Sequence, residues 1–357
     1  MRSDGHTIRF APWWEITVLD SHPAVAVMVL TYNGRAFVEA CLRSVLASSY
    51  PSFRVVAIDN GSTDGTPDMI RSKFPSVDVI RLSQNLGFSA GYNRAIALVP
   101  EEFVILLNQD AEVASRDWIE ELVRVIQSDP ECAVATCKIV FKDNPRILNS
   151  LGGMAYWWTG TVDIGFGERD TDDLPADFEP FSGTGGAMLV RRRPFSEVGG
   201  FDEAFFMYCE DFDLGWRLRL RGYRSLLAPK AKVSHEFSAS LGRMSPTKVY
   251  WVHRNYLRSM LKNYQASSLA RGLPQFLMFT AAKSLGLAMR QRSGELFWAP
   301  WRAVAWNIRL LRDTLTQRAE IQASRKVRDA AILKRMGPRG FEPIASIRRR
   351  LRISSQQ

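Results

Sequence analysis

The stretch FVILLNQD at residues 103–110 places five consecutive apolar residues directly before three polar ones. A short apolar run of this kind is typical of a strand that is buried on both faces of a parallel sheet. Three similar runs precede it, at residues 24–30, 55–58 and 77–82. The segments between the runs, such as 37–47 and 90–98, have apolar residues three or four positions apart, as crossover helices do. The sequence therefore predicts an α/β domain with a mainly parallel central sheet.

The chain divides into four predicted regions. An N-terminal extension covers residues 1–23, and the α/β region continues to residue 240, becoming α+β in character after about residue 128. Within it we expect a helix over 211–221, which ends at Gly222, and a strand over 224–233. Residues 241–336 show helical patterns with few strand signals, and 337–357 have the composition of a poorly ordered basic tail.

Positive charge is concentrated at the C-terminal end. The 357 residues have a formal net charge of +10, but residues 241–357 contain 23 Lys and Arg against 5 Asp and Glu. The first 240 residues are therefore acidic overall. Nucleic acid in the main cleft is disfavoured, because a phosphate backbone needs cations at the site itself. An anionic membrane surface is a suitable partner for the basic region.

The cysteines and the N-terminus bear on the compartment. Four cysteines occur without a C-x-x-C pair, and they do not form the framework of a small disulfide-rich domain. The first residues lack the apolar core and small-residue cleavage site of a secretory signal. We therefore expect a protein of the reducing cytosol.

Ligands of open α/β sheets bind beyond the carboxyl ends of the strands, so the polar residues there are the candidate site. After the first strand, residues 31–34 lack the G-x-G-x-x-G pattern of dinucleotide-binding enzymes. Asp59 follows the second strand and could accept a hydrogen bond from a base imino group or a ribose hydroxyl; alternatively, residues 59–66 form only a helix-capping turn. Asp110 follows the fourth strand and suits Mg²⁺ or Mn²⁺, which take oxygen ligands; alternatively, it caps a helix near Ser115.

Four sequence blocks together resemble family 2 glycosyltransferases of the bacterial rhamnosyltransferase-like branch, which have a GT-A fold. The blocks are VLTYN at 29–33, IDNGSTDGT at 58–66, NLGFSAGYN at 85–93, and FDEAFFMY at 201–208, which runs into EDFDL at 210–214. Their order and spacing are more specific than any one block. The resemblance covers about residues 24–240. It implies a GT-A nucleotide-sugar-binding domain with a mixed, mainly parallel sheet, followed by a helical appendage.

The resemblance also implies roles for individual residues on the donor side. Those assigned to the nucleotide pocket are Thr31, Asn33, Asp59, Asn60, Asn85 and Asn93. Asp110 would be the metal-binding last position of a D-x-D element, and His235 would be a second metal ligand, although a lone histidine is often structural. Asn108 stands where the family has the first Asp, which moves this position toward nucleotide contact and leaves Asp110 with less charge support.

The remaining assignments concern the reaction and the acceptor. Asp211 would be the general base, held ionised by the positive end of a helix dipole, with Glu210 as a positioning residue. Alternatively, both carboxylates only stabilise the start of the helix, and Asp213 pairs with Arg217 at i,i+4 in either case. The residues of the expected acceptor loop are Gly183, Thr184, Gly185 and Gly186, for which a flexible connection is the alternative.

The C-terminal region has the features of a surface-binding segment. From Trp301, apolar residues at 304, 308, 311 and 315 alternate with arginines, which predicts a basic amphipathic helix. Residues 273–289 include Lys283 and are shorter than the roughly 20 apolar residues a spanning helix needs, so they should lie in the membrane interface or pack on the domain. Trp298, Trp301 and Trp306 suit the headgroup level of a membrane, and packing in a core or a homo-oligomer is the alternative.

Taken together, these features predict an inverting, metal-dependent glycosyltransferase. It would move a sugar, on family resemblance rhamnose from dTDP-rhamnose, to a glycan or polyprenyl-diphosphate-linked acceptor in cell-envelope polysaccharide synthesis. It would act at the cytoplasmic face of the cell membrane. Two alternatives remain: a sugar-nucleotide nucleotidyltransferase, which normally needs a Gly-rich phosphate loop after its first strand, and a non-catalytic membrane-bound scaffold.

Overall fold

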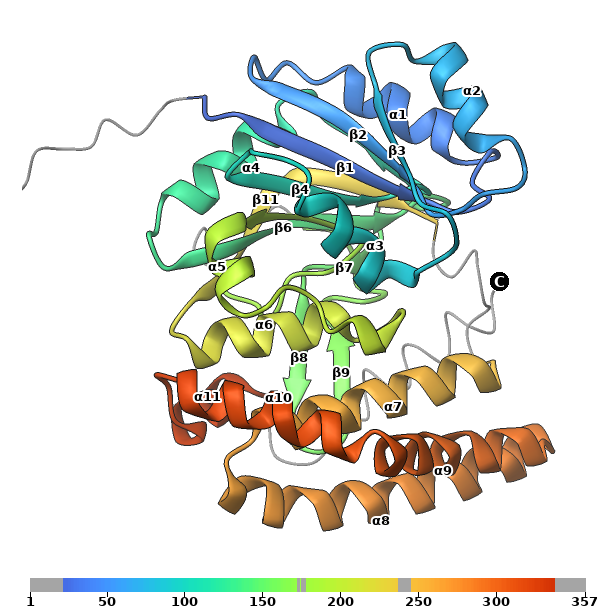
Figure 1. Cartoon of the computed structure of the whole chain (residues 1–357), viewed down its shortest axis with the longest axis vertical. Coiled ribbons are helices and arrows are strands. Elements are labelled where there is room, and N and C mark those ends of the chain that lie inside the picture. Colours follow the sequence, from blue (N-terminus) through green and yellow to red (C-terminus); the bar gives the residue numbers. More distant parts are fainter. Residues whose placement is uncertain (1–21, 172–173, 175–177, 237–244, 338–357) are drawn as a thin grey trace, which may run out of the picture.

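The computed structural model describes residues 22–171, 174, 178–236 and 245–337. The predicted N-terminal extension and basic tail therefore lie almost wholly outside the described residues. The described chain forms a central sheet with helices on both faces, and a separate layer of helices below it (Figure 1).

The sheet is mixed and mainly parallel, as the sequence predicted. Its strand order is β3-β2-β1-β4-β10-β6-β11-β5. Strands β3, β2, β1 and β4 run parallel to one another, as do β6 and β11, while β10 is antiparallel to both β4 and β6. The bounds are β1 Val25–Thr31, β2 Phe53–Asp59, β3 Asp78–Arg81, β4 Phe103–Asn108, β5 Ala111–Val113, β6 Cys132–Phe141, β10 Ala187–Arg191 and β11 Arg224–His235.

Three short strands lie outside that order. β7 (Leu148–Ser150) pairs with β6, and β8 (Gly153–Tyr156) forms a two-stranded ribbon with β9 (Gly160–Asp163). The ribbon extends from the sheet toward the C-terminal helices (Figure 1).

The continuous apolar runs are explained by helices on both faces of the sheet. Val25, Val27 and Val29 of β1 pack in one core with α1 (Val38–Leu46), α2 (Thr66–Lys73) and α4 (Trp118–Gln127). Ala26 and Met28 belong to the opposite core, with residues of α3 (Gly87–Ile96), α5 (Arg192–Glu197) and α6 (Glu210–Leu220). Successive side chains of a strand point to opposite faces, so a strand with two buried faces must be apolar throughout.

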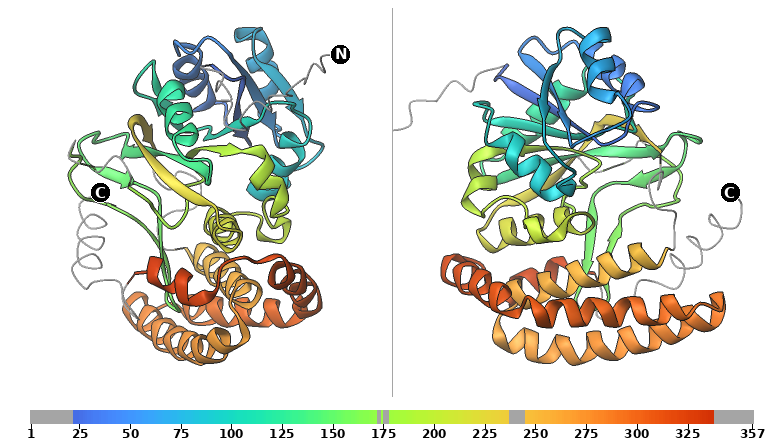
Figure 2. Two further views of the ribbon diagram at one scale, coloured as in Figure 1. Left: turned by 90° about the vertical axis from the view of Figure 1, so that its left-hand side faces the viewer. Right: turned by 45° about the vertical axis from the view of Figure 1, so that its right-hand side comes forward.

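Five helices form the C-terminal layer, which packs beneath α6 and the β8–β9 ribbon (Figures 1 and 2). They are α7 Pro246–Asn263, α8 Ala266–Gln291, α9 Gly294–Arg309, α10 Leu311–Ser324 and α11 Asp329–Arg335. An aromatic cluster that includes Phe212, Trp216, Tyr256 and Tyr264 joins α6 to α7. None of the described helices is both long enough and apolar enough to cross a membrane.

The basic amphipathic helix predicted from Trp301 is not continuous. α9 ends at Arg309 and α10 begins at Leu311, so the predicted stripe is divided between two helices. In α10, Thr314 and Asp313 accept hydrogen bonds of 2.6 and 2.5 Å from Arg258 of α7. The break follows from this tertiary contact, which the pattern of apolar residues does not report.

A cluster of buried charged side chains joins α7 to α6 and to the segment before it. Lys262 donates to Asp202 at 2.5 Å and to Asp213 at 3.2 Å, and Arg258 donates to Asp202 at 2.7 Å. Asp213 also accepts a 2.7 Å bond from Arg217, the i,i+4 pair that the sequence predicted. We call Asp202, Asp213, Arg217, Arg258 and Lys262 the buried charge cluster; all five are buried. Opposite charges alternate through it, which offsets the cost of burial.

Candidate active site

The turns after β1 and β2 are held to each other by side-chain hydrogen bonds. Asn33 has a positive φ of 46°; its backbone N–H donates to Ser62 at 2.9 Å, and its side-chain oxygen accepts from the N–H of Thr63 at 2.9 Å. Thr31 is buried and donates to Gln109 at 2.6 Å, and Gln109 also accepts from the N–H of Tyr32. Thr31 and Asn33 thus shape this edge of the sheet. No role was predicted for Gln109, which lies between the assigned residues Asn108 and Asp110.

Asp59 is the carboxylate at this edge with an acceptor position left over. It is fully buried; Oδ1 accepts from the N–H of Ser62 at 3.1 Å, and Oδ2 has no hydrogen-bond partner among the described residues. The Arg81 guanidinium lies 3.4 Å from Oδ2 and is half exposed. A buried polar atom without a partner is costly, so a ligand hydrogen-bond donor at Oδ2 would be strongly favoured. The capping turn that the sequence left as an alternative is also present, because Asp64 accepts a hydrogen bond from the N–H of Thr66 at the start of α2.

Asn60 and Asn93, both assigned to the nucleotide pocket, use their side-chain amides for hydrogen bonds within the protein. Asn60 donates to Asn85 and to the carbonyl of Gly87, both at 3.0 Å, and accepts from the N–H of Leu86 at 2.9 Å. Asn93 donates to the carbonyl of Phe201 and accepts from its N–H, both at 2.9 Å. These geometries favour a positioning role for Asn60 and Asn93 over the direct nucleotide contact expected from the sequence.

Gly87 brings the third motif against the fourth. Its φ is +77°, and a Cβ atom there would lie 2.4 Å from the carbonyl oxygen of Phe206. The next residue, Phe88, donates its N–H to that same oxygen at 2.6 Å. Only glycine combines this backbone conformation with so close an approach. The side of the site that was predicted to hold the nucleotide is thereby joined to the segment that leads into α6.

Asp110 and His235 face each other across neighbouring strands. β5, which begins directly after Asp110, pairs with the end of β11, and Ala111 is in register with His235. Asp110 Oδ1 lies 3.2 Å from His235 Nε2, and the amide nitrogen of Asn108 lies 3.3 Å from the same imidazole atom. Both side chains of the pair are mostly buried, at 17% and 14% exposure. The helix-capping alternative for Asp110 is not supported, because α4 begins at Trp118 with Asp117 at its cap position.

The pair fits a divalent cation that completes its coordination with other ligands. Two adjacent ligands of an octahedral ion, each at about 2.0–2.1 Å, lie about 3 Å apart, close to the separation of the two side-chain atoms. Among the residues that the structure describes, no group of three or more His, Cys, Asp or Glu is suited to a metal. Such an ion would therefore need water and donor phosphate as its remaining ligands, as Mg²⁺ commonly does.

Glu210 and Asp211 lie at the start of α6, after an unusual backbone. Phe206, Tyr208 and Cys209 have positive φ values of 59°, 68° and 62°. Each such conformation costs on the order of 1–3 kcal/mol and persists only where the surroundings impose it. Asn255 of α7 donates to the carbonyls of Met207 and Tyr208 at 2.9 and 2.6 Å. The helix start is therefore held in place by α7.

Burial, rather than the helix dipole that the sequence suggested, has the largest effect on the pKa values of Glu210 and Asp211. Burial raises the pKa of Asp211 to about 6, against the hydrogen bond from Gly185, and the Asp163 carboxylate raises it further. Burial, followed by repulsion from Asp211, raises the pKa of Glu210 well above its usual range. The sequence prediction relied on the helix dipole to keep Asp211 ionised near neutral pH; burial acts in the opposite direction, but the pKa of about 6 still lies below neutrality. Burial thus favours the protonated form of both carboxylates, and the charge of each opposes ionisation of the other. Asp163, in β9, carried no signal in the sequence.

The loop before β10 connects the acidic pair to the histidine side. The N–H of Gly185 donates to Asp211 Oδ2 at 2.8 Å, and the carbonyl of Gly186 accepts from the N–H of Asn108 at 3.0 Å. Thr184 is fixed by a 3.2 Å bond from its N–H to Thr136. At Gly183, a Cβ atom would lie 2.7 Å from Val134. The loop is thus hydrogen-bonded to Asn108 at one end and to Asp211 at the other, which does not fit the flexible-connection alternative.

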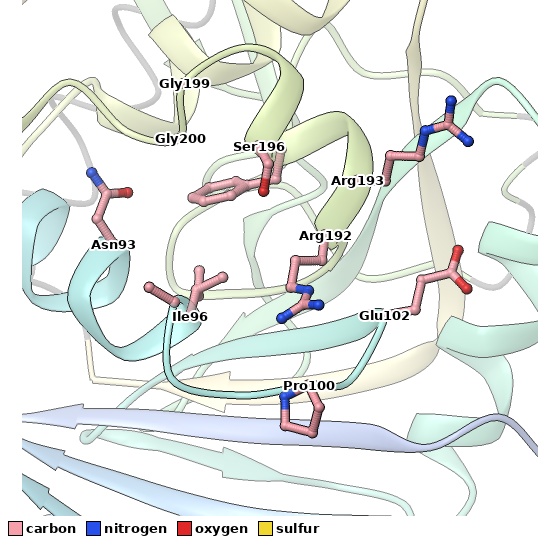
Figure 3. Close-up of a pocket in the computed structure, with 11 residues that line it drawn as sticks. Asn93, Ile96, Pro100, Glu102, Arg192, Arg193, Ser196, Gly199 and Gly200 are labelled. Carbon is pink, nitrogen blue, oxygen red and sulfur yellow. The ribbon is translucent and has the colours of Figure 1, made fainter.

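The two described cavities lie away from this network. One of about 500 Å³ is lined by residues of α3 and α5, with Asn93 and Ile96 facing Arg192 and Ser196 (Figure 3). The other, of about 600 Å³, lies along α3 and includes Leu82 and Glu203. Asn93 is the one assigned site residue that lines either cavity. The sequence predicted one pocket shared by Asp59, Asp110 and Asp211. The loop from Gly183 to Gly186 bonds to Asp211 and to the backbone of Asn108, two residues before Asp110, while Asp59 ends β2, two strands from β4.

Comparison with known proteins places this geometry in a family context. The model of the family described as glycosyl transferase family 2 matches residues 26–199. The N-acetylglucosaminyl-diphospho-decaprenol L-rhamnosyltransferase of Mycobacterium tuberculosis is 32% identical over 255 residues, which cover 63% of this chain and 78% of that protein.

Two solved structures share the fold. TarS 1–349 of S. aureus in complex with UDP-GlcNAc matches with a TM-score of 0.55 at 17% identity, over 84% of this chain and 83% of that one. The mannosyltransferase PcManGT from Pyrobaculum calidifontis, in complex with GDP-Man and Mn²⁺, matches with a TM-score of 0.50 at 19% identity, over 85% and 86%. At these identities the likeness shows the fold alone, and it confirms the predicted GT-A fold.

Proposed function

This chain belongs to glycosyl transferase family 2 and is a glycosyltransferase, and from that premise we propose that it transfers rhamnose from dTDP-rhamnose, with inversion, to a polyprenyl-diphosphate-linked sugar. The reaction would require Mn²⁺ or Mg²⁺ and take place at the cytoplasmic face of the cell membrane, in cell-envelope polysaccharide synthesis. The rhamnosyltransferase relative supports the choice of sugar and of lipid-linked acceptor.

The observation that carries this proposal is the loop from Gly183 to Gly186. It touches Asn108 beside the Asp110–His235 pair at one end and Asp211 at the other. A transferase needs both groups close together, because the leaving diphosphate and the attacking hydroxyl lie on opposite sides of one anomeric carbon.

Asp211 is the proposed base. Its pKa of about 6 leaves it ionised near neutral pH while keeping it basic enough to accept a proton from the attacking hydroxyl. The N–H of Gly185 fixes Oδ2, and the N–H of Phe212 donates to Oδ1 at 2.7 Å. Glu210, whose pKa is raised by burial and by the neighbouring Asp211, would position its neighbour.

Donor binding would fall to the neighbouring strand ends. Asp59 Oδ2, buried and without a hydrogen-bond partner among the described residues, is suited to the imino group of a pyrimidine base. Asp110 and His235 would hold the cation, which when bound neutralises charge on the departing diphosphate. Asn108, between the histidine and the loop, would contact the nucleotide or its ribose.

The alternatives raised by the sequence lose support. A sugar-nucleotide nucleotidyltransferase or a non-catalytic scaffold would not account for the family membership or for the 32% identical transferase. A homo-oligomer stays a prediction.

A donor screen tests the proposal directly. The full chain is incubated with dTDP-, UDP- and GDP-sugars, Mn²⁺ and a short-chain alkyl diphosphate-linked N-acetylglucosamine, and nucleoside diphosphate release is measured. We expect turnover with dTDP-rhamnose that is abolished by EDTA and restored by Mn²⁺. Turnover with another donor alone would refute the proposed sugar, and full activity in EDTA would refute the role of Asp110 and His235.

A further inference from the structure

The outer face of α8 carries an uninterrupted apolar stripe. Met278, Leu285 and Met289 are exposed at 73%, 54% and 72%, and Pro274 and Ala281 on the same helix are also exposed. These five positions are spaced by four, three, four and four residues, so they form one line along the helix. We call them the α8 stripe. Large apolar side chains gathered in a line on a surface mark an interaction site rather than chance exposure.

The stripe points away from the rest of the protein. The opposite side of α8 is buried through Gly272, Phe276, Thr280 and Ser284. Figures 1 and 2 show α8 at the outer edge of the helical layer, farthest from the sheet. The 26-residue helix is about 39 Å long, so its exposed side is an extended flat surface.

The charges along α8 are all of one sign. Its 26 residues include Arg271, Lys283 and Arg290, and no Asp or Glu. Arg292 follows at the helix end and is exposed. An apolar stripe on a helix whose own charged residues are all cations matches a helix that lies in the interface of an anionic bilayer; the exposed Glu295 belongs to the next helix, α9. A symmetric contact between two copies would instead bring the same cations of both together.

The alternative stripe at the α9–α10 junction is less suited to anionic lipid. Ile308, Leu311 and Leu315 are exposed, at 67%, 41% and 52%. They are divided between two helices, and the exposed carboxylates of Asp313 and Glu320 lie on α10. Arg309 and Arg312 are exposed there as well, but these carboxylates offset part of their charge, whereas α8 carries cations only.

The C-terminal end of α8 is connected to the active site through α7. Leu287 of α8 packs in one cluster with Val249 near the start of α7. Two residues further, Trp251 contacts the ring of Phe206 at 5.3 Å. The carbonyl of Phe206 in turn accepts the hydrogen bond from the N–H of Phe88, whose ring lies beside Gly185. A surface bound along α8 would thus be linked to the segment before Asp211 through packed side chains.

We propose that the α8 stripe docks the enzyme on an anionic lipid surface, with the apolar side chains in the acyl boundary and the cations against lipid phosphates. The docking rests on the proposed function in one respect: a lipid-linked acceptor would require the enzyme to work at a membrane surface. The sequence prediction placed a basic amphipathic helix from Trp301 at the membrane and left residues 273–289 either in the interface or packed on the domain. In the structure one side of α8 is buried and its outer stripe is exposed.

Vesicle flotation tests the proposal with two matched triple variants. The full chain is mixed with vesicles of phosphatidylcholine alone, or of equal parts phosphatidylcholine and phosphatidylglycerol. We expect binding to the anionic vesicles only, lowered at least about tenfold in Met278→Gln/Leu285→Gln/Met289→Gln. The control Ile308→Gln/Leu311→Gln/Leu315→Gln should bind within about twofold of wild type. Circular dichroism checks that both variants are folded.

Three results would overturn the proposal. They are equal binding to both vesicle types, wild-type binding by the α8 variant, and a wild-type dimer in light scattering that the α8 variant dissociates. The last would identify a second copy as the occupant of the stripe. Turnover of the water-soluble acceptor by the wild-type chain is measured in parallel. Its absence, with vesicle binding intact, would contradict the proposed function and still support docking.

Discussion

The backbone N–H of Gly185 donates a 2.8 Å hydrogen bond to Oδ2 of Asp211. This bond joins the loop before β10 to the first turn of α6, two segments that are 26 residues apart. It orients the carboxylate that we assign as the base and stabilises its charged form against the desolvation that opposes it.

Replacing the base should stop catalysis without preventing donor binding. Asp211→Asn keeps the shape of the side chain but cannot accept the proton, so kcat should fall by about 10²–10⁴-fold. Glu210→Gln is the matched control, because the raised pKa of Glu210 favours the neutral form that glutamine imitates, and its kcat should fall less than about tenfold. Steady-state kinetics and calorimetric titration of the donor check both variants. A larger loss in Glu210→Gln would reverse the two assignments.

The pH profile should reflect the raised pKa of Asp211. Since the base must be ionised, kcat should rise tenfold per pH unit below about pH 6 and level off above it. The same shift makes the folded state bind more protons than the unfolded state, so this group's contribution to stability falls as pH rises from about 4 to 6. Activity measured from pH 4.5 to 8.5 tests the first point. A flat profile through pH 6 in the wild-type enzyme would contradict it.

Removing either proposed metal ligand should weaken cation binding. His235→Ala and Asp110→Asn are each expected to raise the Mn²⁺ concentration for half-maximal activity at least about tenfold. Electron paramagnetic resonance of free Mn²⁺ measures the affinity independently of turnover. Asp68→Asn, on the surface of α2, serves as the control. Unchanged Mn²⁺ affinity in both ligand variants would place the cation elsewhere.

Breaking the buried charge cluster should unfold the protein more readily. Lys262→Met leaves Asp202 and Asp213 short of a cation, which should lower the free energy of unfolding by about 3–5 kcal/mol. Lys73→Met removes an exposed pair with Glu39 and should cost at most about 1 kcal/mol. Urea titration compares the two. Equal losses of unfolding free energy in the two variants would show that burial does not determine how much the cluster contributes to stability.

Two glycines should respond in opposite directions to alanine. Gly87→Ala introduces a Cβ against the Phe206 carbonyl at a positive φ, and should lower the free energy of unfolding by about 1–3 kcal/mol. Gly286, inside α8, has nothing within 4 Å of an added Cβ. Gly286→Ala should therefore raise stability by up to about 1 kcal/mol. Thermal unfolding of both variants measures the difference, and a stable Gly87→Ala would contradict the close approach.

The sequence by itself determined the central sheet and the positions to inspect. Apolar runs such as FVILLNQD specify strands buried on both faces, and the parallel connections bring their polar ends to one edge, because these patterns depend on local spacing. It also predicted the Asp213–Arg217 pair, which a single helix turn dictates. Motifs marked Asp59, Asp110, Asp211 and the loop from Gly183 for the same local reason.

Only the tertiary structure decided how these residues act. Asn60 and Asn93 were predicted to bind nucleotide, but their amides bond to Gly87 and Phe201, partners that the fold brings from elsewhere in the chain. The pKa of Asp211 is raised by burial, which no spacing reports. The division at Leu310 and the exposure of the α8 stripe depend on which side of each helix packs on α7. Burial and long-range contact arise from the folded chain as a whole, so the sequence pattern alone could not determine them.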